Sequence, residues 1–258
     1  MKTLAVACAV LLAVAPVAHA AAACHATSGA TVRPLVELYT SEGCDSCPPA
    51  DRWLSAHFRG SADGAIALAF HVDYWDRLGW KDRFATPAYT ARQYQAAGAN
   101  GASFVYTPQV LLQGHDFRWQ RRDAEDAVRQ ATAAAPRARI EATVVADGPE
   151  WRVEANAMVD DPAARGDAVL TVAYADSGLV SEVKAGENRG ARLSHDRVVR
   201  ALYSTARADR EGRIVAHARL PRPAEAGRDA VVVAFVQREG DGSVLQALEL
   251  PLAACASR

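Results

Sequence analysis

The chain has 258 residues, half of them hydrophobic and 23% charged, and its formal net charge is -1. This length and apolar content allow two ordinary domains with a sizeable core. The near balance of charge, without a basic stripe, argues against a nucleic-acid-binding protein.

The first 20 residues have the pattern of a secretory signal peptide. Lys2 supplies a positive start, residues 4–17 are mostly apolar, and residues 18–20 (Ala-His-Ala) place small residues where signal cleavage requires them. The apolar stretch is shorter than a bilayer requires, and no later segment approaches that length. We therefore expect a periplasmic or secreted monomer without a membrane span. Lipidation at Cys24 is an alternative, but the preceding residues lack the usual leucine.

Residues 33–135 alternate strand-like runs with helical patterns, which is typical of a parallel or mixed α/β layer. The predicted elements are strand 35–39, helix 50–59, strand 65–70, helix 87–97, a strand within 106–114 and helix 123–135. The polar and aromatic run 71–76 follows the fully apolar strand 65–70. Open α/β sheets build their sites at this end of a strand.

The second half of the chain has a different pattern. Seven runs alternate apolar and polar residues, and turn signals separate them: 139–145, 151–159, 168–175, 192–203, 212–220, 229–237 and 243–250. Short alternating strands without helices indicate an antiparallel sandwich. We therefore expect an α+β protein with a signal peptide at 1–20, an α/β domain at 21–136 and an all-β sandwich-like domain at 137–258.

Cys44 and Cys47 stand at the junction between the first strand and the first helix. Such a pair can form a labile disulfide or hold a soft metal ion. Cys44 is the expected nucleophile, since the amino end of a helix favours a thiolate, and Cys47 is the expected resolving thiol. Glu42 and Asp45 oppose the thiolate by a similar amount, so the sequence leaves open whether the pair oxidises or reduces its partner.

Cleavage of the signal peptide would remove one of the five cysteines and leave four, Cys24, Cys44, Cys47 and Cys255. An even number in an oxidising compartment favours two pairs. If Cys44 pairs with Cys47, the remaining pair is Cys24 with Cys255, a structural bond worth up to about 5 kcal/mol in the chain-entropy model. Two free terminal thiols are the alternative.

Two strings narrow the interpretation: residues 36–51 (VELYTSEGCDSCPPAD) and 70–76 (FHVDYWD). With the order of elements and Thr107-Pro108, they resemble the secreted bacterial thioredoxin-like proteins grouped as domain of unknown function family 1223. The resemblance runs from about Pro34 to the carboxyl terminus. It implies a thioredoxin-like first domain, a β-rich second half and an exported protein. It also implies that Pro108 is a cis-proline beside the disulfide.

The resemblance also suggests the role of Glu37. Thioredoxins carry a buried acid on the first central strand that moves protons to the second cysteine. Glu37 is the candidate in this chain, although it lies one residue further from the cysteines than the match requires. A structural, hydrogen-bonded Glu37 is the alternative.

We therefore expect a thiol-disulfide oxidoreductase without a cofactor, acting on a protein thiol or disulfide partner. The candidate site residues are Cys44, Cys47, Pro108 and Glu37 for catalysis, with Thr107, Pro108, Tyr74 and Trp75 holding the partner. The alternatives are a purely structural disulfide and a copper(I)- or zinc-binding module formed by Cys44, Cys47 and His71.

Ser194, His195 and Asp196 are residue types found in hydrolases. Neighbouring residues on a strand point to opposite faces, whereas a catalytic triad needs side chains that converge. We therefore expect no hydrolase site there.

Overall fold

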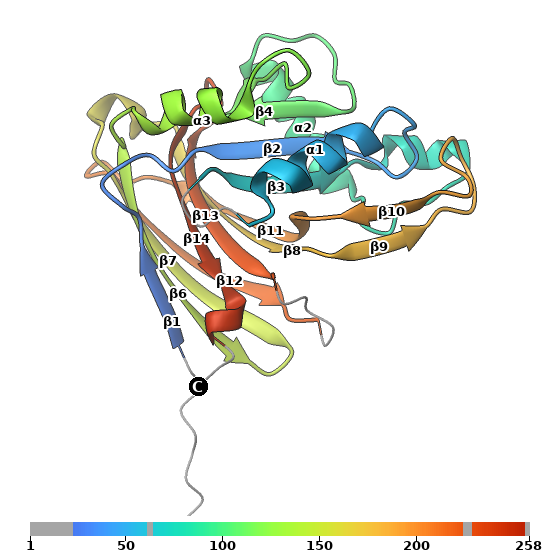
Figure 1. Ribbon diagram of the computed structural model, residues 1–258. Helices are drawn as coiled ribbons and strands as arrows, with labels where there is room; N and C mark the ends of the chain where they lie inside the picture. Colours follow the sequence, from blue (N-terminus) through green and yellow to red (C-terminus); the bar gives the residue numbers. More distant parts are fainter. Residues whose placement is uncertain (1–22, 61–63, 224–228, 256–258) are drawn as a thin grey trace, which may run out of the picture.

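The computed structural model describes residues 23–60, 64–223 and 229–255 (Figure 1). The predicted signal peptide lies outside these residues. Strands make up 42% of the described residues and helices 20%. In the part of the chain that the structure describes, no helix is long and apolar enough to cross a membrane.

The largest sheet is mixed and has eight strands. Their order is β14 (Val244–Pro251), β13 (Val231–Arg238), β8 (Ala168–Asp176), β11 (Val198–Arg207), β3 (Ile66–His71), β2 (Leu35–Thr40), β4 (Gln109–Leu112) and β5 (His115–Asp116). A four-stranded antiparallel sheet follows the order β1 (Ala23–Thr27), β6 (Ala138–Asp147), β7 (Glu150–Val159) and β12 (Arg213–Pro221). A separate hairpin consists of β9 (Leu179–Glu182) and β10 (Arg192–His195).

Three α-helices and three 3₁₀ segments complete the described part of the chain. They are α1 (Pro48–Phe58), α2 (Pro87–Ala99), α3 (Ala124–Thr132), η1 (Asp73–Leu78), η2 (Pro162–Ala164) and η3 (Leu252–Cys255). Two of the α-helices begin at side-chain caps, because Thr86 accepts from the Tyr89 amide and Asp123 accepts from the Asp126 amide.

The predicted fold class is wrong. The expected α/β thioredoxin-like domain followed by a separate all-β sandwich is replaced by large mixed and antiparallel sheets with few helices. Strands on both sides of the predicted boundary at 136/137 belong to the same eight-stranded sheet, where β11 lies parallel to β3 with Val198 opposite Ala69. The reason is that β3 is buried along its whole length and needs a neighbour on each edge. Its second neighbour comes from the other half of the chain.

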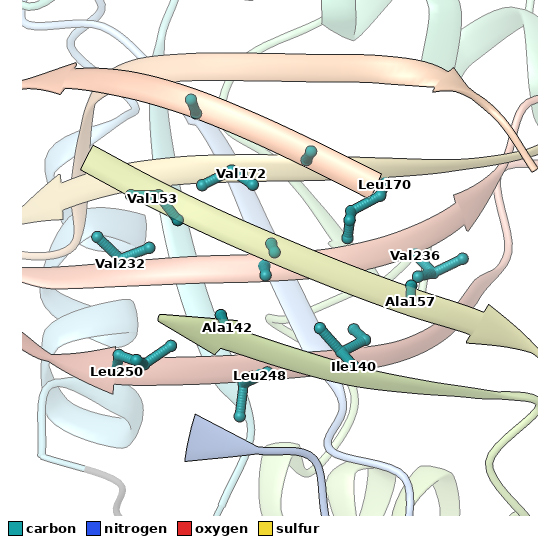
Figure 2. Close-up of a cluster of buried hydrophobic side chains, with 14 of the residues drawn as sticks. Ile140, Ala142, Val153, Ala157, Leu170, Val172, Val232, Val236, Leu248 and Leu250 are labelled. Atoms are coloured by element: carbon teal, nitrogen blue, oxygen red, sulfur yellow. The ribbon is translucent and has the colours of Figure 1, made fainter. Parts of the chain in front are cut away.

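The two sheets enclose the largest apolar cluster. Figure 2 draws its side chains from both sheets: Ile140, Ala142, Val153, Ala157, Leu170, Val172, Val232, Val236, Leu248 and Leu250. Strands β6, β7 and β12 alternate buried and exposed positions, so each gives one face to this cluster. Each fully buried Val, Leu or Ile contributes about 1.5–3 kcal/mol, which makes this cluster the main apolar core.

Strand β2 is buried on both faces by helices. Leu38 packs in one cluster with Leu54 of α1 and with residues of α3. Tyr39 packs in another cluster with Tyr89 of α2. Because successive side chains of a strand point to opposite faces, β2 presents one face to α1 and α3 and the other to α2. These two faces decide which residues can reach the cysteines.

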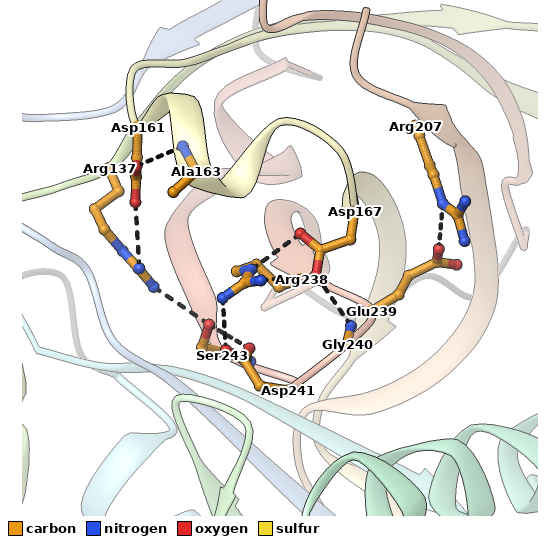
Figure 3. A network of polar contacts seen from close by, with 10 residues as sticks. All are labelled: Arg137, Asp161, Ala163, Asp167, Arg207, Arg238, Glu239, Gly240, Asp241 and Ser243. Carbon is orange, nitrogen blue, oxygen red and sulfur yellow. Dashed lines mark hydrogen bonds and ion pairs between the residues drawn. The ribbon is translucent and has the colours of Figure 1, made fainter.

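A surface network of ion pairs ties the β13–β14 turn to the segment around η2 (Figure 3). Arg238 makes a bidentate pair with Asp167, with distances of 2.9 and 3.0 Å, and a further bond of 2.7 Å to Asp241. Arg137 donates to Ser243 and approaches Asp161 at 3.5 Å. The network fixes this turn on the segment between β7 and β8.

Candidate functional site

Both predicted cysteine pairings are present as disulfides. Cys24 and Cys255 have Cα atoms 5.2 Å apart, and Cys44 and Cys47 have Cα atoms 5.4 Å apart. The first bond joins the two ends of the described chain, beside the main apolar core. The second bond lies where β2 passes into α1, so it is the candidate functional site.

The turn that carries the second disulfide is formed by backbone hydrogen bonds. The Cys44 amide donates to the Ser41 carbonyl and the Cys47 amide donates to the Cys44 carbonyl, both at 3.2 Å. Cys47 is the N-cap of α1, and Pro48 occupies the first helical position, where no amide donor is needed. The pair therefore lies at the positive end of the helix dipole, which favours a thiolate there.

Donor groups gather around the Cys44 sulfur. The Thr107 hydroxyl lies 3.5 Å from Cys44 Sγ, and the Ser46 hydroxyl lies 3.3 Å from it. Trp75 Nε1 donates to Thr107 Oγ1 at 2.8 Å. The Thr107–Pro108 peptide bond is cis. The structure thus places Thr107 at the Cys44 sulfur and Trp75 on Thr107, and their role in holding a partner stays a prediction.

Two further predicted site residues differ in their surroundings. Tyr74 donates its hydroxyl to Gln93 Oε1 at 3.2 Å and also lies within hydrogen-bonding range of Thr107, the residue beside Cys44 Sγ. Glu37 is fully buried and pairs with Arg92 of α2 at 2.8 Å, while it accepts from Tyr39 at 3.1 Å. Glu37 therefore faces α2, whereas the cysteines belong to α1 and its preceding loop. The structural alternative describes its surroundings better than the proton-transfer role does.

A cluster of buried titratable side chains lies on the α1 face instead. Its members are Glu42, Asp51, His71, Asp82 and His195, and each is less than 9% exposed. His71 Nδ1 and Asp82 Oδ2 are 2.6 Å apart. His195 places Nε2 3.3 Å from Glu42 Oε1 and Nδ1 4.0 Å from Asp51 Oδ2. We call these five residues the buried cluster.

Five segments of the chain each contribute one residue to the buried cluster. Phe70 packs against Tyr89 of α2, so the next residue, His71, points to the α1 face. Asp51 lies one helical turn after Cys47, on the same side of α1. Glu42 comes from the cysteine loop, Asp82 from the segment after η1, and His195 from β10.

The electrostatics of the cluster follow from burial and pairing. Burial alone would lower the pKa of His71, but the Asp82 carboxylate outweighs burial, so the pKa of His71 is raised. Burial alone would raise the pKa of Asp82, but His71 and two backbone amides hold it below its usual range. The pKa of Glu42 is likewise lowered, because its bond to His195 and other donors outweigh burial.

Asp51 differs from the other two carboxyl groups. Burial raises its pKa, and the opposing effects of His195, His71 and Thr40 only partly compensate. A carboxyl group that prefers its proton, one helical turn from Cys47, can exchange that proton at a higher pH than an exposed aspartate.

The β9–β10 hairpin also contributes a residue at the cysteine loop itself. Asn188 Nδ2 donates to the Glu42 carbonyl at 2.9 Å and to the Cys44 carbonyl at 2.8 Å. The amide of Asp45 donates to Glu187 Oε2 at 3.1 Å. Nothing in the sequence indicated Asn188, and His195 was considered only for a hydrolase site. Alternation on β10 indicates that Leu193 and His195 share the buried face, but nothing local indicates what His195 meets.

The arrangement gives no support to the metal hypothesis. Within residues 23–60, 64–223 and 229–255, no group of three or more His, Cys, Asp or Glu side chains is placed to hold a metal ion. Cys44 and Cys47 are bonded to each other, and His71 is paired with Asp82.

Three comparisons with known proteins give relatives but no activity. A family model described as "Protein of unknown function (DUF1223)" matches residues 35–237. The chain is similar to the crystal structure of a protein from Agrobacterium tumefaciens, with 27% identity and a TM-score of 0.60 over 85% of this chain and 94% of that chain. Its fold is also similar to HBP35 of Porphyromonas gingivalis, with 12% identity and a TM-score of 0.62 over 87% of this chain and 76% of that one. No curated protein matches.

Proposed function

Because the chain belongs to the DUF1223 family of proteins of unknown function, we propose its function from the site alone: it is a thiol-disulfide oxidoreductase that acts on protein partners through Cys44 and Cys47. One observation carries the proposal. The disulfide lies at the amino end of α1, and the Thr107 and Ser46 hydroxyls lie beside the sulfur of Cys44. Hydroxyl donors and a helix end both stabilise a sulfur anion.

The exchange proceeds in two steps. A thiolate of a partner dithiol attacks Cys44 Sγ, a new disulfide forms between partner and Cys44, and the Cys44–Cys47 bond breaks with Cys47 leaving as a thiolate. The second partner thiol then loses its proton and attacks the partner's own sulfur in the mixed disulfide. Cys44 leaves as a thiolate. The partner is oxidised by two electrons and the Cys44–Cys47 pair is reduced; the reverse sequence reduces a partner disulfide.

The proposed location is an exported, oxidising compartment, reached after removal of the predicted signal peptide. Disulfides persist in such compartments and are rare in the cytosol. The reaction needs no cofactor, because the electrons pass between sulfur atoms of the two proteins.

Single cysteine variants test the activity. We expect Cys44→Ser to abolish exchange with a model protein disulfide, and Cys47→Ser to accumulate the mixed disulfide on Cys44, which mass spectrometry would detect. The matched control is the double variant Cys24→Ser, Cys255→Ser, which should keep exchange in conditions where it remains folded. Unchanged turnover in Cys44→Ser would refute the proposal.

A redox titration separates an exchanging pair from a structural one. The pair should titrate reversibly against glutathione buffers between about -120 and -270 mV. Its position in that range would tell whether the protein oxidises or reduces its partner. A pair that stays oxidised below about -300 mV would instead indicate a structural disulfide.

A further inference from the structure

The β9–β10 hairpin projects from the eight-stranded sheet as an arm (Figure 1). Strand β8 ends at Asp176 and β11 begins at Val198. Between them, β9 and β10 pair as strands only with each other and form a separate two-stranded sheet. Gly178 and Arg197, at the base of the arm, both have positive φ angles, of 73° and 60°. The chain therefore turns sharply where it leaves and re-enters the sheet.

The tip of the arm lies on the cysteine loop. Asn188 bridges the carbonyl oxygens of Glu42 and Cys44, and Glu187 accepts the amide of Asp45. Nearby, a Cβ atom on Gly186 would lie only 3.3 Å from Trp80 Cβ, so the two backbones approach closely. The tip is thus bonded to the cysteine loop by these hydrogen bonds, while Val183 at the base of the loop is buried.

The sulfur atoms are closed off in this arrangement. Cys44 and Cys47 are each 0% exposed, whereas Asp45 and Ser46 between them are exposed. A partner thiolate must approach Cys44 Sγ along the axis of the S–S bond. No attack is possible while Cys44 is fully buried, so exchange requires a segment packed on it to move. Thr107 and Ser46 contact the sulfur itself, and loop 183–191 is bonded to the Cys44 carbonyl oxygen.

We propose that Asn188 is a positioning residue of the disulfide site and that loop 183–191 is the segment a partner protein displaces to reach Cys44. When the loop moves away, the carbonyl oxygens of Glu42 and Cys44 lose the Asn188 amide. An extended segment of the partner replaces it with its own backbone N–H groups. The inference rests on the proposed function for its partner, but the displacement of the loop does not depend on activity.

Reduction by dithiothreitol tests the displacement directly. One dithiothreitol thiolate attacks Cys44 Sγ and releases Cys47. The second thiol closes the reagent into a cyclic disulfide and releases Cys44, so the reagent loses the two electrons that the protein gains. Asn188→Asp keeps the shape of the side chain but replaces the donating amide with a carboxylate. We expect it to raise the rate of Cys44–Cys47 reduction by roughly tenfold, because two hydrogen bonds hold the closed loop.

The control is Asn156→Asp on β7, which replaces a half-buried asparagine far from the cysteines. It should leave the reduction rate unchanged. A rate in Asn188→Asp equal to that of Asn156→Asp, with both proteins folded, would overturn the displacement of the loop.

Hydrogen exchange in the unaltered protein gives a test that no folding defect can obscure. The Asp45 amide donates to Glu187 of the arm, and the Val183 amide donates to the Ala191 carbonyl within the arm. We expect them to exchange together and faster than the amides of β2 and β3, because the arm opens without global unfolding. Equal protection of both groups would overturn the proposal.

A peptide pair tests the partner's role. A cysteine peptide should reduce Cys44–Cys47 at least tenfold faster than the same peptide N-methylated on both sides of its cysteine. Equal rates would overturn the backbone recognition. If Cys44→Ser kept full exchange activity, the proposed function would fail. The dithiothreitol rates would still show whether loop 183–191 must be displaced to expose Cys44.

Discussion

The two disulfides stabilise the protein in different ways. The bond between Cys24 and Cys255 closes a separation of 231 residues, and the bond between Cys44 and Cys47 closes one of 3 residues. In the chain-entropy model the long closure is worth about 5 kcal/mol and the short one about 2 kcal/mol. The short bond restricts the unfolded chain little, so its surroundings give a better account of its presence.

Those surroundings also differ. Cys255 is buried in the main apolar core, and Cys24 packs against that core. Cys44 has two hydroxyl groups beside its sulfur and a buried acid–base cluster beneath its loop. The comparison places one bond in the core between the two sheets, and the other, for which we propose an exchange function, beside hydroxyl and titratable groups.

The largest effect should come from removing the long bond. We expect the double variant Cys24→Ser, Cys255→Ser to lose up to about 5 kcal/mol of unfolding free energy, because its unfolded chain regains the entropy of the closed loop. Urea unfolding of the variant and the unaltered protein measures the difference. A loss below about 1 kcal/mol would remove the distinction between the two bonds.

The next effect concerns the polar support of the short bond. Asp82→Asn keeps the side-chain shape but leaves buried His71 without its carboxylate. We expect a loss of about 3 kcal/mol, since breaking a buried pair leaves an uncompensated group. The same variant should lower the pKa of His71, which NMR titration can follow. The conservative exposed change His57→Gln should leave stability nearly unaltered.

The buried pair also predicts how stability depends on pH. The pKa of His71 is raised in the folded protein, so its contribution is complete below about pH 6.5 and is lost as pH rises through the raised value. The pKa of Asp82 is lowered, so its contribution is complete above about pH 4 and is lost as pH falls through the lowered value. The raised pKa of Asp51 acts in the same direction as that of His71.

Urea midpoints at several pH values test this expectation. In respect of the His71–Asp82 pair alone, the unaltered protein should be most stable between about pH 4 and 6.5, and Asp82→Asn should remove most of the decline above that window. A parallel pH profile in both proteins would show that the pair does not control it.

The smallest effect should come from the surface network of Figure 3. Asp167→Asn breaks the bidentate pair with Arg238, whose side chain is 28% exposed. We expect a loss of no more than about 1 kcal/mol, which shrinks further in high salt. Disulfide exchange should be unchanged, because the network is far from Cys44 in the fold. A loss as large as that of Asp82→Asn would contradict our expectation that the buried cluster contributes more to stability than the surface network does.

Local features could be predicted from the sequence. Strand 35–39 and helix 50–59 are found at Leu35–Thr40 and Pro48–Phe58, because apolar periodicity and first-turn prolines act over neighbouring residues. Both disulfide pairings were also predicted, the first from the close spacing of Cys44 and Cys47 and the second because Cys24 and Cys255 were the pair that remained.

The failures share one physical cause. The pairing of β3 with β11 joins residues 129 positions apart, since Ala69 lies opposite Val198. Asn188 lies 144 positions from Cys44, and its side-chain amide donates to a backbone carbonyl, a group that every residue possesses. Periodicity describes one element at a time, so it indicates that a face is buried and leaves its partner unspecified. The family resemblance was confirmed, but the fold class drawn from it was not.

The order of the eight-stranded sheet also has a consequence for the chain as it leaves the ribosome. Strands β2 and β3 can pair early, but the free edge of β3 waits for β11, which is made more than a hundred residues later. An apolar edge left open for that time is a template for pairing with another nascent chain. During the same interval Cys24 has no terminal partner, so a nascent chain oxidised too early can pair it with Cys44 or Cys47. Completing the chain before it meets an oxidising compartment therefore favours the Cys24–Cys255 bond.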